Sequence, residues 1–139
     1  MKFKNITAFL LTAFFAAILA LSCATRPVAI PDDISAPELI QRAQEASDRN
    51  RYFVSLQYYE TVINRFPYDI DNVCAAEYEI AFIHYKQKKY DIAKVELTDL
   101  LERYNSRDGE LLPPQFKILS EKILGNIKEI ENKKNKAGA

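Results

Sequence analysis

The 139-residue sequence has few of the residues that build chemical sites. It contains no tryptophan, one histidine, two cysteines and three glycines, and its 19 Lys and Arg equal its 19 Asp and Glu. The lone His84 cannot form a metal site or a catalytic triad by itself, and three separated glycines cannot form a phosphate-binding loop. The absence of a basic excess argues against nucleic acid as a partner. We therefore expect no catalysis, no metal and no cofactor.

Cysteine is also too scarce for a disulfide framework. Cys23 lies at the end of an apolar run, which leaves Cys74 alone in the rest of the chain. We expect Cys74 to be a small buried side chain, because unpaired cysteines are often buried.

The N-terminus has the pattern of an export signal. Lys2 and Lys4 precede an apolar run from residue 6 to residue 21, which ends in Ala-Leu-Ser before Cys23. The run is shorter than the ~20 residues that a membrane span needs. The pattern resembles the lipobox of bacterial lipoproteins, in which the cysteine becomes the first residue of the mature chain and is acylated. Because Ala20 stands where the lipobox usually has leucine, cleavage after Ala24 and an uncleaved anchor stay open.

On this interpretation, residues 1–22 are a signal peptide and the mature chain has 117 residues. Residues 23–35 contain two X-Pro steps and no helical period, which favours an extended tether to the membrane. Residues 36–132 form one helical domain, and residues 133–139 a disordered tail. The expected helices span residues 36–49, 52–65, 72–88, 91–104 and 114–132.

The helical part repeats with a period of 38 residues. After that shift, large, small and charged residues superpose without a gap. The superposed pairs are Ala43/Ala81, Tyr52/Tyr90, Ser55/Ala93, Tyr59/Leu97, Val62/Leu100, Arg65/Arg103 and Phe66/Tyr104. A helix pair that recurs at this spacing is typical of a helical solenoid.

The repeat resembles the tetratricopeptide repeat (TPR) family. Ile80, Ala81, Tyr90 and Ala93 match its aliphatic, small, tyrosine and small positions, and His84 stands where the family prefers tyrosine. The resemblance implies an all-α TPR-like solenoid of two helix-turn-helix pairs. Small residues such as Ala81 and Ala93 would bring the paired helices close together.

The last helix is expected to seal the stack. Its apolar residues recur at spacings of three and four, which gives it one apolar face. These residues are Phe116, Leu119, Ile123, Ile127 and Ile130. A partner-binding helix is the alternative, although two repeats alone leave too little core.

The TPR resemblance also implies a binding groove lined by the first helix of each pair. The candidate partner-binding residues are Ile40, Gln44 and Asp48 from the first pair and Tyr78, Phe82, Tyr85 and Lys86 from the second. The three aromatic residues share one helix face and suit an extended peptide or a helix. The alternative is that the last helix covers them.

Residues 59–68 resemble the repeat closure of the BamD-type lipoproteins of outer-membrane β-barrel assembly. That resemblance implies a non-catalytic adaptor in the bacterial cell envelope, lipid-anchored in the outer membrane and facing the periplasm, with a protein partner. A solute-transport accessory that binds a small ligand in the groove is the alternative. Partner identity and homo-oligomerisation stay open.

Overall fold

A computed structural model describes residues 27–137, so the predicted signal peptide and Cys23 lie outside the described residues. Five α-helices and one short 3₁₀ helix follow one another along this part of the chain, and it contains no strand. They are α2 (Ala36–Asp48), α3 (Tyr52–Arg65), α4 (Ile70–Lys86), α5 (Tyr90–Tyr104), η2 (Gly109–Leu111) and α6 (Pro114–Ala137). No helix among them is both long and apolar enough to cross a membrane.

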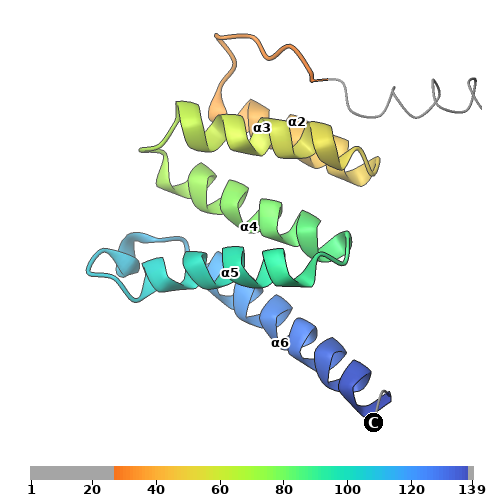
Figure 1. Ribbon diagram of the computed structural model, residues 1–139. Coiled ribbons are helices and arrows are strands. Elements are labelled where there is room, and N and C mark those ends of the chain that lie inside the picture. The colour runs from red at the N-terminus through yellow and green to blue at the C-terminus, as the bar shows by residue number, and fades with distance from the viewer. Residues whose placement is uncertain (1–26, 138–139) are drawn as a thin grey trace, which may run out of the picture.

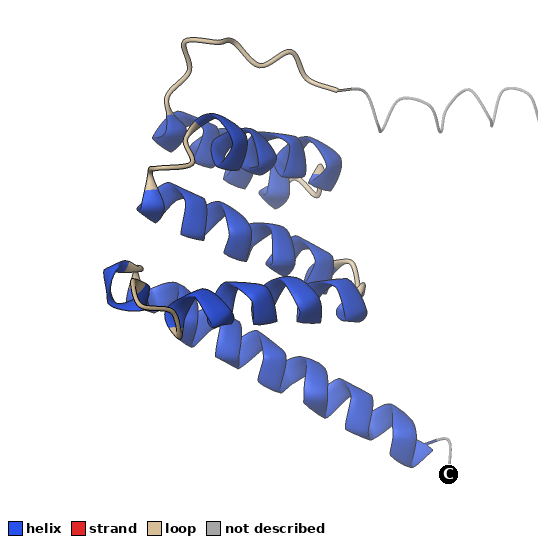
Figure 2. Cartoon of the chain, turned by 60° about the vertical axis from the view of Figure 1, so that its left-hand side comes forward, coloured by secondary structure: helices blue, strands red, loops and turns tan. Residues whose placement is uncertain are grey.

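The predicted architecture is confirmed. The helices α2 and α3 form one antiparallel pair, α4 and α5 form a second pair, and α6 follows as a single helix (Figure 1). The pairs stack through contacts of α3 and α2 with α4, which gives the layered arrangement of a TPR-like solenoid (Figure 2).

The 38-residue period reappears in the helix boundaries. The second helix of each pair begins at Tyr52 and at Tyr90, which are 38 residues apart. The turns before these helices each contain one residue with positive φ, Asn50 at 57° and Lys88 at 62°. The left-handed residue at Lys88 explains why α4 ends at Lys86, two residues before the predicted end.

Small residues at the repeat positions hold the paired helices together. Ala81 and Ala93 are fully buried, as predicted, and so is Ala43. Ser55 is also buried, and its hydroxyl donates a 2.8 Å hydrogen bond to the Ala43 carbonyl in the facing helix. Within each pair, the two helix backbones therefore approach closely, because no large side chain lies between them at these positions.

The helix α6 seals the second pair. Ile123 and Ile127 are buried against α4 and α5, and Phe116 and Leu119 pack on the same cluster. The helix continues to Ala137, so residues 133–137 are helical, although the sequence analysis placed a disordered tail there. The basic residues of this last turn suit the negative end of the helix dipole, and residues 133–137 contain neither glycine nor proline.

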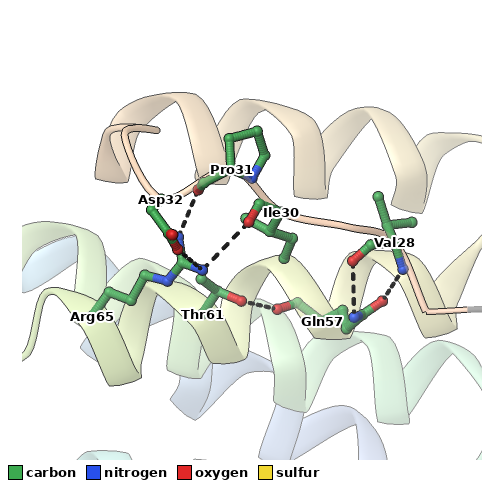
Figure 3. A network of polar contacts seen from close by, with 7 residues as sticks. All are labelled: Val28, Ile30, Pro31, Asp32, Gln57, Thr61 and Arg65. Atoms are coloured by element: carbon green, nitrogen blue, oxygen red, sulfur yellow. Dashed lines mark hydrogen bonds and ion pairs between the residues drawn. The ribbon is translucent and has the colours of Figure 1, made fainter.

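The described part of the predicted tether is docked on the domain. Residues 27–35 have no helix or strand, but Val28 and Ile30 pack against the core of the first pair and Ile34 is buried. Gln57 of α3 exchanges two hydrogen bonds with the Val28 backbone, of 2.9 and 3.3 Å (Figure 3). The prolines suggested a free linker, whereas the apolar residues between them cover the exposed face of the first helix pair.

Arg65 of α3 holds the same segment about two helical turns further along α3. Its guanidinium donates to the carbonyl of Pro31 at 2.7 Å and to that of Ile30 at 3.5 Å (Figure 3). It also pairs with the exposed Asp32 carboxylate at 3.4 Å. The segment thus runs along α3.

Candidate functional site

A hollow of about 290 Å³ lies between the first helices of the two pairs. We call it the α2–α4 groove. It is lined by Gln44, Ser47 and Asp48 of α2, Tyr59 of α3, and Glu79, Phe82 and Lys86 of α4. Four of the predicted partner-binding residues, Gln44, Asp48, Phe82 and Lys86, therefore come together here.

The other three predicted residues lie differently. Tyr78 is 6% exposed and packs against Phe82 and against Phe116 of α6, so it belongs to the core between α4 and α6. Tyr85 is half-buried and packs on Phe82 and Tyr90. Ile40 is half-buried against the core of the first pair. The helix α6 thus covers part of the aromatic face, which is the alternative that the sequence left open.

The three groove residues of α4 lie on one face of that helix. Glu79, Phe82 and Lys86 are spaced three and four residues apart, so their side chains share a stripe of the helix. Asp69 caps the N-terminus of this helix, because its carboxylate accepts a 3.3 Å hydrogen bond from the Asn72 backbone N–H.

Lys86 has several internal partners. Its ammonium donates a 2.7 Å hydrogen bond to the Ser47 hydroxyl, which links α4 to α2. The same nitrogen lies 5.2 Å from the ring centroid of Tyr52 and 5.1 Å from that of Phe82. These cation–π contacts hold Lys86 at one side of the groove.

Tyr59 brings a buried hydroxyl to the groove. The residue is fully buried, and its hydroxyl has no hydrogen-bond partner among the described residues. Burial raises the pKa of Tyr59 further above its usual value, and the nearby carboxylates of Glu79 and Asp48 add to this shift. The phenol therefore keeps its proton and can both donate and accept a hydrogen bond.

Glu79 is the second polar residue that the sequence analysis missed. Burial raises its pKa, Lys86 opposes that shift, and Asp48 adds to it. The helical spacing of residues 79, 82 and 86 was the sequence signal by which Glu79 could have been found. Tyr59 could have been found because it has a hydroxyl at the position where the other copy of the repeat has Leu97.

A second hollow, of about 240 Å³, lies between α3, α4 and α5. Three of its charged residues have partners, because Arg103 pairs with Glu77 and the Glu96 carboxylate lies 2.8 Å from Nδ1 of His84. The α2–α4 groove differs in that its buried hydroxyl lacks a partner. In residues 27–137, no three His, Cys, Asp or Glu side chains cluster closely enough to hold a metal ion.

Fold and groove together define a small helical-repeat scaffold with a polar groove. The chain is similar to an uncharacterized protein of Treponema pallidum (strain Nichols), with 33% identity over 119 residues, or 86% of this chain. The chain spans 47% of that protein's length. No protein-family model and no solved structure matches the chain.

Proposed function

We propose that this protein is a non-catalytic adaptor of the bacterial cell envelope that binds a protein partner in the α2–α4 groove. In this proposal a lipid on Cys23 anchors the chain, most simply in the outer membrane with the domain facing the periplasm. The resemblance to BamD-type lipoproteins suggests a role in outer-membrane protein assembly. The similarity to a protein of Treponema pallidum, a bacterium, agrees with an export signal of this type.

One observation carries the binding part of the proposal. The groove combines an aromatic wall at Phe82 with a buried hydroxyl on Tyr59 that lacks a partner. Buried polar groups usually find hydrogen-bond partners within the fold, so an unpaired group in a groove marks a place where a ligand group can complete the bonding.

A protein partner suits the groove better than a small solute. A solute-binding site would be a deep cleft or cavity that buries most of the ligand and is lined mainly by apolar side chains. A cavity lined by all three aromatic residues would have favoured that alternative. Tyr78 is instead covered by Phe116, and the groove has exposed residues, Gln44 and Asp48, on its α2 side.

Binding is tested by blocking the groove with a bulky side chain. Gln44 is exposed and lines the groove, whereas Gln41 is exposed on the same helix and does not line it. We expect Gln44→Trp to abolish co-purification of the partner from detergent-solubilised envelopes, and Gln41→Trp to leave it intact. Equal co-purification with both variants would show that the partner binds elsewhere.

The anchor is tested by the intact mass of the protein isolated from membranes. We expect a chain that begins at Cys23 and carries fatty acyl groups, and we expect Cys23→Ser to release the protein from the membrane. An unmodified chain with a different first residue would end the lipoprotein hypothesis.

A further inference from the structure

We infer that the α2–α4 groove binds a lysine side chain of the partner protein, with its ammonium held by Asp48, Glu79 and Tyr59. This inference rests on the proposed function and names the chemical group that the groove recognises.

Charge is the first argument. The groove contains two carboxylates, those of Asp48 and Glu79, and one ammonium, that of Lys86. Lys86 is already engaged with the Ser47 hydroxyl and with two aromatic rings. The groove therefore has an excess of one negative charge, and a guest with a single positive charge would balance it.

Hydrogen-bonding capacity is the second argument. The carboxylates of Asp48 and Glu79 are acceptors, and the Tyr59 hydroxyl oxygen can also accept. The side chains of Asp48, Tyr59 and Glu79 all line the same hollow. An ammonium has three N–H donors, which matches three acceptors that come from three different helices.

The methylene chain of the bound lysine would contact Phe82, an aromatic residue of the groove. Phe82 is the apolar side chain in the lining of the groove, so the methylene chain of a lysine can contact it while the ammonium reaches the carboxylates. A guanidinium suits this site less well, because its planar fork pairs best with both oxygens of one carboxylate, whereas these acceptors are on separate helices.

The test uses Nα-acetyl-lysine N-methylamide as the probe and the full-length protein in detergent micelles, observed by two-dimensional NMR. The norleucine analogue, which has the same chain without the amine, is the matched probe. We expect saturable shifts at groove residues with a millimolar dissociation constant for lysine, and binding of norleucine weaker by about tenfold or more.

Variants identify the groups that hold the ammonium. We expect Glu79→Gln and Asp48→Asn each to weaken lysine binding by about tenfold, and Tyr59→Phe by a few fold. Glu60→Gln, which changes an exposed glutamate of α3 outside the groove, is the control and should leave binding unchanged. Retained shifts elsewhere in the spectrum show that each variant is folded.

Two results would overturn the inference. One is equal binding of the lysine and norleucine probes, or no saturable shift with either. The other is unchanged lysine binding in both carboxylate variants, which would mean that Asp48 and Glu79 do not hold the ammonium. If the lysine probe fails while Gln44→Trp still blocks the partner, this inference is wrong and the proposed function stands.

Discussion

At the scale of single residues, Tyr59 is the clearest departure from the repeat. It occupies the position of Leu97 in the second copy, and both side chains are fully buried. Leucine fills that position with apolar atoms alone, whereas tyrosine adds a hydroxyl that has no partner in the described chain. Because such a group costs free energy, its presence in the groove favours a role in binding over a role in stability.

Replacing Tyr59 with phenylalanine tests this cost. We expect Tyr59→Phe to leave the free energy of unfolding unchanged or to raise it by up to about 1 kcal/mol, because no hydrogen bond is lost. Tyr104→Phe is the matched control, since the Tyr104 hydroxyl donates a 2.7 Å bond to the Pro113 carbonyl. That variant should lose about 0.5–1.5 kcal/mol in chemical denaturation. Equal losses in both variants would show that the Tyr59 hydroxyl is satisfied.

Glu79 gives a prediction that depends on pH. Burial raises its pKa, so the folded state binds the proton more tightly than the unfolded state, whose glutamate pKa is about 4.3. The stability that comes from this proton is present at low pH and is lost as pH rises through the raised pKa. Ionised Glu79 therefore destabilises the fold at pH 7.

We expect Glu79→Gln to raise the melting temperature at pH 7 by about 2–5 °C, and the gain to disappear below about pH 4. Thermal unfolding followed by circular dichroism across this range measures it, with Glu60→Gln as the control. A variant that is less stable than the wild type at pH 7 would contradict the assigned direction of the pKa shift.

At the scale of the helices and their turns, the sequence predicted most of the fold. The residues that repeat every 38 positions are mostly buried small and large side chains, and these are the residues through which the helices pack in pairs. The docked segment was missed because its prolines hid the apolar residues Val28 and Ile30, which find a partner surface only once α2 and α3 are packed. The Tyr59 hydroxyl was missed because a repeat pattern records size and apolarity and not hydrogen-bond partners.

The left-handed turns before α3 and α5 give a stability test of the repeated turn geometry. Asparagine tolerates the left-handed region better than lysine does, and the first copy has Asn50 where the second has Lys88. We expect Lys88→Asn to stabilise the protein by about 0.5–1 kcal/mol. A Lys88→Asn variant that is no more stable than the wild type in chemical denaturation would contradict the turn geometry.

The docked N-terminal segment can be released by removing one side chain of α3. Arg65→Ala deletes the bonds to Pro31 and Ile30 and the ion pair to Asp32. We expect hydrogen exchange of residues 28–34 to become roughly tenfold faster, because each such bond contributes about 0.5–1.5 kcal/mol. Arg103→Ala is the matched control one repeat later, where the arginine pairs with Glu77 instead. Unchanged exchange in Arg65→Ala would mean that apolar packing alone holds the segment.

At the scale of the whole molecule, the docked segment limits how far the domain could lie from a lipid anchor on Cys23. Only four residues separate Cys23 from Val28. A fully extended chain spans at most about 3.6 Å per residue, so a lipid on Cys23 would hold the first helix pair within roughly 20 Å of its anchor. The α2–α4 groove would then meet partners close to the membrane, where anchoring raises their effective concentration.

Site-specific photo-crosslinking in intact cells tests the central claim most directly. An aliphatic diazirine amino acid of about the size of glutamine replaces Gln44 in the groove or, in the control, Gln41 on the same helix outside it, and crosslinked proteins are identified by mass spectrometry. The adaptor proposal predicts one discrete envelope protein crosslinked from position 44 and absent from position 41. The same products from both positions, or none from position 44 while the protein is folded and anchored, would contradict it.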